Sequence, residues 1–381
     1  MSSFPPLDLD LEKEFPILQK RIFMNHAGVS PLPARAMRAL QVWAEDACVN
    51  GPYHWPRWDA DRERTRELFA QLIGATTDEV CFVKSTTHGL LIVANSLKWK
   101  QGDNIVTVEN EFPANVYPWR HLVSKGVELR VAPQRSGRFD PESLEALMDD
   151  HTRLATVSHV SFYSGFRCDV NRIGQICKEH GVLFCVDAIQ GLGAVPLDVR
   201  EANIDFLSAD GHKWLLSVEG FGGFYCRAEA RKQLDDTMTG WMGRVRRSDY
   251  LDYDKPLEDS ALRFEEGATN LCSAQALKAS LMLLMEVGIP NIHQRILALT
   301  DLLIAGLKKR GARVVCPESR DERSGIVVFE NPSTDSETVV RRLAGKGIFV
   351  ASRSGRIRVS PHFYNTPGQI ETLLAELGRR S

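Results

Sequence analysis

The strongest structural signal in this sequence is the segment Ser208-Ala209-Asp210-Gly211-His212-Lys213-Trp214. A lysine follows an apolar, strand-like run and a turn of small residues, and a tryptophan follows the lysine. Upstream, the segment Gly181-Val182-Leu183-Phe184-Cys185-Val186-Asp187 is a second apolar run, and it ends in one acid. An amine and a carboxylate, 26 positions apart, are therefore each expected at the end of a buried strand.

Pyridoxal phosphate (PLP) chemistry requires this pair of groups. A lysine forms a Schiff base with the cofactor aldehyde, and an acid keeps a proton on the pyridine nitrogen so that the ring can accept electrons. A lone lysine after a strand is usually a solvated loop residue, and a lone aspartate there is usually a turn former or a helix cap. Gln190, three residues after the acid, and His212, beside the lysine, favour the cofactor.

Residues 182–223 resemble the class V aminotransferases most strongly. This group of PLP enzymes includes cysteine desulfurases, kynureninases and isopenicillin N epimerase-like proteins. The resemblance implies an α/β protein with the PLP-dependent transferase fold type I. In that fold a large domain has a mostly parallel sheet sandwiched by helices, and a smaller α+β domain accompanies it. The resemblance also implies that Gln190 bonds the ring hydroxyl oxygen and that His212 reaches the phosphate or the lysine.

The pattern along the chain agrees with a parallel sheet. Short apolar runs at 80–83, 105–108, 127–131, 154–157 and 182–186 alternate with helix-like segments, which is typical of strands covered on both faces. Beyond Gly267, long amphipathic helices and shorter strand-like pieces indicate a second unit. We expect a large PLP-binding domain over 25–272. The family packs its first two dozen residues with the C-terminal part, so the small domain is expected over 1–24 and 273–381.

Composition narrows the possible partners and the compartment. The net charge is −2 with 25% charged residues, so there is no basic surplus for nucleic acid, and no apolar run has the length of a membrane span. The first ten residues carry acids and prolines where a signal peptide has basic and apolar residues. Eight cysteines without Cys-x-x-Cys spacing indicate free thiols in a reducing cytoplasm, and no metal site is expected.

The segment Lys84-Ser85-Thr86-Thr87-His88 is the candidate phosphate site. It follows a strand-like run and opens a helix-like one, so free backbone N–H groups and the helix dipole favour an anion there. An ordinary Ser/Thr helix cap is the alternative, preferable if Lys213 were absent. Thr86 and Thr87 match the family's Gly/Ser-Thr-Thr run, which implies that both bind the phosphate.

Two further family positions concern the ring and the substrate. Glu111-Phe112-Pro113-Ala114-Asn115 resembles the stretch whose aromatic residue stacks on the pyridine ring, a role that falls here to Phe112. Arg358 opens a run that resembles the C-terminal segment whose arginine forks onto the substrate α-carboxylate, and a guanidinium suits that bidentate contact. Without the resemblance, Phe112 would be a core residue and Arg358 a surface one.

The remaining family positions imply a shared site. The segment 264–270 resembles the one that delivers a threonine to the phosphate of the neighbouring subunit, so Thr269 implies a homodimer. Asn25 and His26 match the N-terminal segment that lines the substrate side. His159 also matches a family position, although the residues leave its role open.

The sequence departs from the desulfurases at two places. Asp210 stands where they often have a serine, and a carboxylate would repel phosphate, so Asp210 is expected to point elsewhere or to bind backbone. Desulfurases also carry a nucleophilic cysteine before the carboxylate arginine, whereas this chain has none after Cys316. Since a persulfide mechanism requires a thiolate near the substrate, Cys272 is a weak substitute.

These residues predict an enzyme that acts on a small amino acid. The lysine amine, freed beside the imidazole of His212, would take the Cα proton while Asp187 keeps the ring protonated. Transamination by a class V aminotransferase ranks first, β-elimination by a desulfurase-like lyase second and epimerisation third. A catalytically silent PLP-binding regulator is the non-enzyme alternative. PLP binding alone requires neither Asp187 nor Arg358, so the presence of both argues against a silent regulator.

Overall fold

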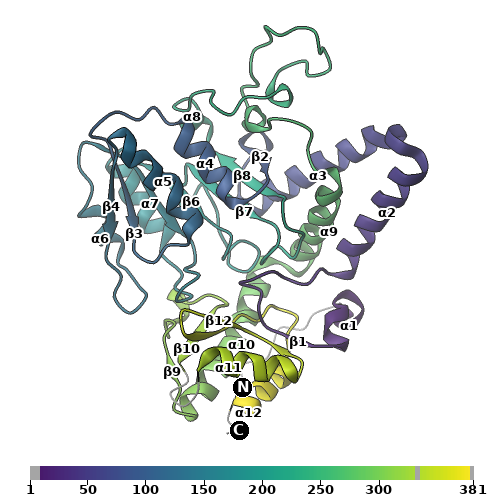
Figure 1. The fold of residues 1–381 in the computed structure, drawn as a ribbon, viewed down its shortest axis with the longest axis vertical. Helices are drawn as coiled ribbons and strands as arrows, with labels where there is room; N and C mark the ends of the chain where they lie inside the picture. Colours follow the sequence, from purple (N-terminus) through teal and green to yellow (C-terminus); the bar gives the residue numbers. More distant parts are fainter. Residues whose placement is uncertain (1–8, 331–334, 378–381) are drawn as a thin grey trace.

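The computed structural model describes residues 9–330 and 335–377. Its centre is a seven-stranded sheet with the order β2-β8-β7-β6-β5-β3-β4 (Figure 1). Antiparallel pairing joins β8 to both of its neighbours, and the other pairings of this sheet are parallel. The strands are β2 (Val80–Val83), β3 (Asn104–Val108), β4 (Glu128–Ala132), β5 (Thr152–Ser158), β6 (Leu183–Asp187), β7 (Phe206–Asp210) and β8 (Gly222–Cys226). The mostly parallel sheet predicted from the sequence is confirmed.

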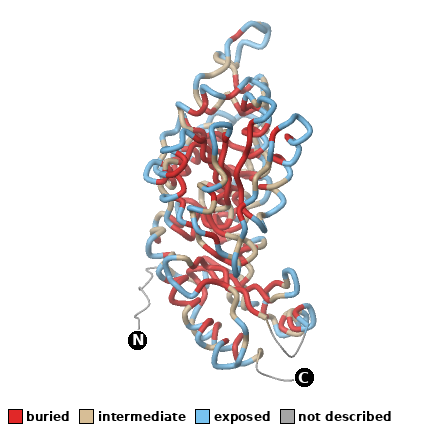
Figure 2. The backbone as a smooth tube through the Cα atoms, turned by 90° about the vertical axis from the view of Figure 1, so that its left-hand side faces the viewer, coloured by how far each residue is buried: buried red, intermediate tan, exposed pale blue. Residues whose placement is uncertain are grey.

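Both faces of this sheet are covered. Successive residues of a strand point to opposite faces, and Phe184 belongs to one buried apolar cluster while Cys185 belongs to another. The buried strands form the centre of the molecule in Figure 2. Helices that contribute to the first cluster are α3 (Trp55–Ile73), α7 (Val170–Glu179) and α9 (Leu271–Val287), and helices that contribute to the second are α4 (Thr86–Ser96) and α5 (Tyr117–Leu122).

Strand β8 depends on two glycines, and the sequence predicted no strand range there, although Cys226 at its end lies in a strand-like apolar run. A Cβ atom at Gly222 would lie 2.2 Å from the Ala209 carbonyl oxygen, and one at Gly223 would lie 2.3 Å from the ring of Phe69. The close approach of β8 to β7 and α3 therefore excludes side chains there. Because glycine is unfavourable in most strands, the pattern gave only a weak strand signal.

A smaller antiparallel sheet with the order β12-β13-β10-β9 lies at the other end of the chain. The N-terminal segment joins this unit, because Ile22 pairs with Ile348 and Met24 is buried in the same apolar cluster. The strands are β9 (Arg313–Val314), β10 (Val327–Glu330), β12 (Ala351–Arg353) and β13 (Arg356–Val359). Two further strands, β1 (Ile22–Phe23) and β11 (Ile348–Phe349), form a separate parallel pair. Its helices are α10 (Ile289–Lys309), α11 (Ser336–Gly345) and α12 (Pro367–Leu377).

Helix α9 begins at the expected boundary between the two units. It packs against α2 (Ala34–Asn50) and α3 (Figure 1). Its Leu277 and Leu281 belong to the first of the two apolar clusters that cover the large sheet. The division at residue 272 stays a prediction. Residues 1–8 of the expected small domain lie outside the described residues.

All eight cysteines are free, and six of them are buried. No single helix within residues 9–330 and 335–377 is long and apolar enough to cross a membrane. Helices α9 and α10, which are bent by 77° relative to each other, reach the required length and apolar composition only as a pair.

Candidate active site

A cavity of about 510 Å³ opens where β6 and β7 end. In parallel sheets the carboxyl ends of the strands are the usual place for ligands. Most of the residues predicted for the site line this cavity, namely Thr86, Thr87, Phe112, Asp187, Gln190, His212, Lys213 and Arg358. The structure therefore brings together groups that are separated by up to 272 positions.

Asp187 and Lys213 are the buried charge pair of this cavity. Asp187 is the last residue of β6 and is 2% exposed, and Lys213, three residues after β7, is 9% exposed. Burial raises the pKa of the Asp187 carboxyl to about 6, although its Oδ1 accepts a hydrogen bond from the Ile189 N–H at 3.1 Å. Burial lowers the pKa of the Lys213 amine to about 8. A neutral amine is therefore accessible near physiological pH.

The amino end of α4 is the anion site of the cavity. Ser85 caps this helix by accepting the His88 N–H at 3.1 Å, which leaves the first backbone N–H groups, those of Thr86 and Thr87, without intrahelical acceptors. Both threonines line the cavity. Free N–H groups, hydroxyls and the helix dipole together fit a phosphate.

Asp210 lines the same cavity as Thr86 and Thr87, and its carboxylate makes a backbone hydrogen bond. Its Oδ1 accepts the Gly211 N–H at 2.6 Å, and its Oδ2 lies 3.2 Å from Nδ1 of His212. The Asp210 N–H donates to Oγ1 of Thr86 at 3.0 Å, so the strand end and the helix start are tied together. Asp210 thus orients His212 and Thr86, which both face the cavity.

Gln190 is held from two sides at the floor of the cavity. Its Oε1 accepts the indole N–H of Trp214 at 3.1 Å, and its Nε2 donates to the Ala27 carbonyl at 3.1 Å. One amide hydrogen of Gln190 remains for a ligand. Trp214 therefore fixes the side chain of Gln190 in place.

An aromatic pair covers the mouth of the cavity. The ring of Phe112 is 40% exposed, packs edge-on against Phe162 at 5.1 Å between centroids, and lies 5.4 Å from Nζ of Lys213. Phe162, which the sequence analysis did not single out, lines the cavity as well. The pair provides an apolar wall opposite Asp187 and a face against which a planar ring can stack.

Arg358 is a buried cation without an ion-pair partner among the residues that the structure describes. It is 2% exposed, its Nε is buried without a hydrogen bond, and it forms no ion pair within the described residues. Burial lowers the pKa of its guanidinium to about 10, and the neighbouring Arg353 adds to this effect. A buried, uncompensated guanidinium is costly, so the geometry indicates an anionic ligand.

The hairpin β12-β13 decides which arginine reaches the cavity. Arg356 instead pairs with Glu330 at 3.0 Å and lies over the ring of Tyr163. Arg353, which pairs with Arg356 across the hairpin, also lines the cavity and was not predicted. The two-residue turn between them, Ser354 and Gly355, has positive φ angles of 50° and 76°.

His26 does not line the cavity. It is fully buried, with Nδ1 at 2.8 Å from the Ser360 carbonyl oxygen and Nε2 at 2.6 Å from the Tyr364 hydroxyl. Burial lowers the pKa of its imidazole to about 4. Both ring nitrogens of His26 join the N-terminal segment to the chain after β13, and its expected substrate contact stays a prediction. Ala27, Gly28 and Val29 line the cavity instead.

Three other expected residues lie away from the cavity of their own protomer. Asn25 packs beside Gly28 without lining it. Thr269 faces a second cavity, of about 410 Å³, and its expected contact is with a neighbouring subunit. His159 is 2% exposed and lies behind Asp187, whose backbone carbonyl accepts the His159 N–H at 2.9 Å.

Among the described residues, no cysteine lines the cavity that contains Lys213. Cys272 is partly buried at the start of α9, beyond Thr269, and burial raises the pKa of its thiol. Within the described ranges, no group of three histidine, cysteine or acidic side chains could hold a metal ion. The cavity therefore offers an amine, an acid and a guanidinium, but not a thiolate.

The arrangement fits PLP. Thr86 and Thr87 would hold the phosphate, Asp187 the pyridine nitrogen and Gln190 the ring oxygen, with Phe112 over the ring. Each polar end of the cofactor then meets a group whose hydrogen-bonding capacity is partly unused. The unpartnered guanidinium of Arg358 is left for the carboxylate of a substrate.

Comparison with known proteins decides the family. The aminotransferase class-V model matches residues 22–373, nearly the whole chain. The chain belongs to the class V aminotransferase family. Its cofactor is pyridoxal phosphate, and it has the fold type I architecture that the resemblance implied.

Individual relatives of this class V enzyme carry different names. A probable cysteine desulfurase of Methanothermobacter thermautotrophicus is 30% identical over 386 residues, covering 96% of each chain. The uncharacterized aminotransferase YcbU of Bacillus subtilis is 27% identical, again covering 96% of each chain. A solved mutant of C-DES with glycine covalently linked to its PLP cofactor has a TM-score of 0.90 at 23% identity, covering 96% of this chain and 98% of the other, and shows the shared fold.

Proposed function

We propose that this class V enzyme eliminates a β-substituent from a small α-amino acid without using a thiolate of its own. One observation carries the proposal. The cavity joins Lys213, Asp187 and the unpartnered Arg358, and no cysteine lines it. The first three groups bind and deprotonate an amino acid, whereas transfer of sulfur to the enzyme would require a fourth.

Arg358 would bind the substrate α-carboxylate. Its guanidinium is buried beside the lysine, so an arriving carboxylate would neutralise a charge that has no other partner. The contact fixes the amino acid with its amine toward Lys213. Arg353, on the outer side of the same cavity, raises the positive potential along the entrance.

Proton transfer would then fall to Lys213. With a pKa near 8 its Nζ is neutral in a sizeable fraction of molecules and accepts the Cα proton. Asp187 would hold the pyridine nitrogen of the bound cofactor, and Phe112 and Phe162 form an aromatic wall of the same cavity. Bound PLP supplies the electron sink for the carbanion. His212 lies beside the lysine and is the nearest imidazole for protonating a leaving group.

The comparisons support elimination at least as well as transamination, which the residues alone ranked first. The relative at 30% identity is named a probable cysteine desulfurase, which indicates chemistry at a carbon–sulfur bond. Persulfide transfer needs a thiolate near the substrate, and in this cavity elimination can release the sulfur directly. Transamination is the second candidate, and it is favoured by the Bacillus subtilis relative, which is named an uncharacterized aminotransferase.

We also propose a homodimer with shared sites. Thr269 faces away from the cavity that contains Lys213, on the loop expected to reach the phosphate of a neighbour. Its hydroxyl would complete the donor set begun by Thr86 and Thr87 in the partner.

The three reactions give different products from L-cysteine. Elimination yields sulfide and, after addition of water, pyruvate and ammonia, while desulfuration yields alanine and sulfur bound to a thiol. Transamination yields a mercapto keto acid and leaves the amino group on the cofactor. We expect pyruvate, ammonia and sulfide in equal amounts, with none from the Lys213→Ala variant. Alanine or a keto acid that retains its sulfur would overturn elimination, and a cofactor spectrum that no amine changes would favour a silent regulator.

A further inference from the structure

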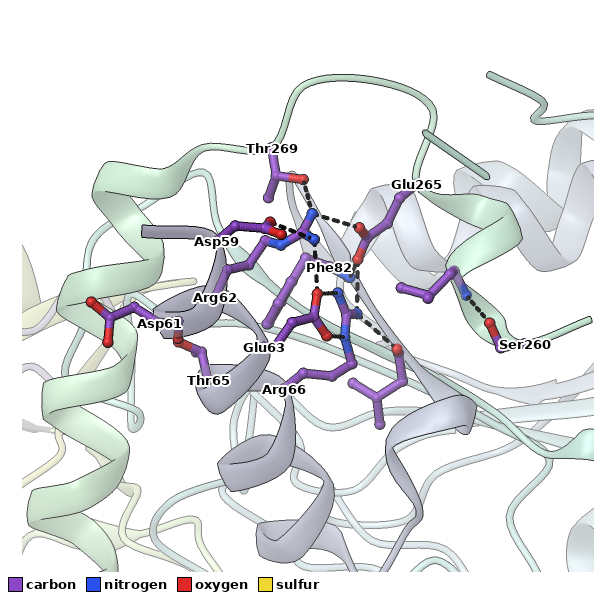
Figure 3. Close-up of polar contacts among 12 residues, drawn as sticks. Asp59, Asp61, Arg62, Glu63, Thr65, Arg66, Phe82, Ser260, Glu265 and Thr269 are labelled. Carbon is purple, nitrogen blue, oxygen red and sulfur yellow. Dashed lines mark hydrogen bonds and ion pairs between the residues drawn. The ribbon is translucent and has the colours of Figure 1, made fainter. Parts of the chain in front are cut away.

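Glu265 is a fully buried carboxylate between two segments that belong to phosphate sites. It is 3% exposed, and its Oε1 accepts hydrogen bonds from the Phe82 N–H at 3.0 Å and from Nη1 of Arg66 at 2.8 Å (Figure 3). Phe82 lies in β2, three residues before Ser85, so the bond to Glu265 fixes the strand that leads into the anion site of the protomer's own cavity.

The other oxygen of Glu265 reaches Thr269 through Arg62. Oε2 lies 3.4 Å from Nη1 of Arg62, and the same nitrogen donates to Oγ1 of Thr269 at 3.2 Å (Figure 3). Because Arg62 occupies a lone pair of this hydroxyl, the hydroxyl hydrogen is free to donate to another acceptor. The arrangement holds Thr269 with its donor available.

Stability alone is a weak explanation for this cluster. Arg62 and Arg66 are each 2% exposed, and Glu63 pairs with both at 2.8 and 3.0 Å. Burying several charges costs free energy that well-packed apolar side chains would avoid, so such clusters are better explained by the geometry that they impose. The geometry imposed here is that of the loop from Glu265 to Asn270.

The same two segments meet again at the surface. Lys84 pairs with Glu266 at 2.5 Å, and Lys84, His88, Glu265 and Thr269 line one cavity of about 410 Å³. The loop that carries Thr269 is thus joined to the turn before α4 on both its buried and its exposed side.

We propose that Glu265 and Arg62 are positioning residues that set two phosphate contacts at once, that of the protomer's own turn before α4 and that of Thr269 in the neighbouring protomer. The proposal rests on the proposed function, in which PLP is shared across a dimer. Each Glu265 then links one half of its own phosphate site to the other half of the partner's site, because every protomer supplies one half to itself and the other half to its partner.

A double-mutant cycle tests this positioning role. The dissociation constants of PLP and of pyridoxal, which lacks the phosphate, are measured for the full-length apoprotein and for Glu265→Gln, Thr269→Ala and the double variant. We expect each single change to weaken PLP binding roughly tenfold and pyridoxal binding hardly at all. The double variant should lose less than the product of the two single effects, because part of the Glu265 effect acts through Thr269. Any loss beyond that of Thr269→Ala reports the contact at the turn before α4. Glu67→Gln, which removes an exposed carboxylate paired with Arg64 on α3, is the matched control and should bind like the original protein.

Other outcomes overturn the proposal in distinguishable ways. Additive losses would show that Glu265 does not act through Thr269, and equal losses of PLP and pyridoxal would show that Glu265 acts only on stability. Unchanged PLP binding by Thr269→Ala would show that Thr269 makes no phosphate contact, and Glu265 would then have nothing to position there. Failure of the unaltered protein to bind PLP would refute the proposed function itself. If Glu265→Gln does not fold, Arg62→Lys, which keeps a cation beside Glu265, enters the same cycle with the same expected outcome.

Discussion

Asp187 lies in register with Ser208 on the neighbouring parallel strand. Because β6 ends opposite Ser208, two residues before β7 ends at Asp210, the turn after β7 places Lys213 in the cavity that Asp187 also lines. Acid and amine are thereby held by the sheet itself and not by a flexible loop. The distance between them depends on the pairing of two buried strands, which resists local motion.

Replacing Asp187 by asparagine should separate cofactor binding from catalysis. The amide keeps the shape of the side chain but cannot hold a proton on the pyridine nitrogen, so the carbanion loses its sink. We expect PLP to be retained and turnover to fall at least about 100-fold. Equilibrium binding and steady-state kinetics on the same preparation measure both quantities. Near-normal turnover would refute the role of this carboxylate.

Replacing Arg358 by alanine should weaken substrate binding. Loss of a charge-assisted contact of roughly 1.5–3 kcal/mol corresponds to about a 10–150-fold lower kcat/KM. Arg356→Ala is the matched control, because Arg356 lies on the same strand but pairs with Glu330 outside the cavity. Equal effects of the two changes would show that Arg358 is not the carboxylate site.

Capture of PLP by the apoprotein should depend on pH through Lys213. A neutral amine attacks an aldehyde, and burial lowers the pKa of this amine to about 8. The rate of capture should therefore rise tenfold per pH unit below about pH 8 and level off above it, whereas an ordinary lysine would level off near its usual pKa of about 10.4. Stopped-flow absorbance follows the reaction. A rate still rising steeply at pH 9.5 would contradict the lowered pKa.

Changing Cys272 to alanine should leave activity intact. Its thiol lies outside the cavity and has a raised pKa, so it is neither near the substrate nor ionised. Cys48→Ala, at an exposed position, is the control for thiol loss in general. Loss of activity in the Cys272 variant alone would restore the persulfide mechanism that we have set aside.

Replacing Trp214 by phenylalanine should destabilise the apoprotein by about 1–3 kcal/mol, because Oε1 of Gln190 would lose its donor inside the core. Trp241→Phe removes an exposed indole and should cost less than about 0.5 kcal/mol. Urea unfolding of the two variants compares the free energies. Equal midpoints would show that the Gln190 bond contributes nothing.

The sequence predicted the parts of the site that follow a local pattern. Asp187 and Lys213 each end a short apolar run, and such runs indicate buried parallel strands without further information. His26 could not be placed in this way, because its partners Ser360 and Tyr364 are 334 and 338 positions away. Contacts between such distant segments depend on how the two units pack. The spacing of apolar residues along the sequence is a local pattern and does not predict these contacts.

The same limit explains the residues that were missed. Arg353 reaches the cavity only because the hairpin β12-β13 folds back beside Arg358, and the Glu265 cluster forms only when α3 packs under its loop. Neither residue differs from a surface charge in its local sequence. Family resemblance supplied Thr269 and Arg358, but it carried no information on what holds them.

The tight turn at Ser354 and Gly355 makes the tip of the β12-β13 hairpin a place where evolution can insert or delete residues. Both residues are exposed, and they connect two arginines that are already paired across the hairpin. Extra residues inserted at this tip could leave both strands as they are, and a nucleophile carried by such an insertion would arrive at the cavity entrance. An ancestral enzyme could thus gain or shed its own sulfur acceptor in one step, while the buried sheet stayed the same.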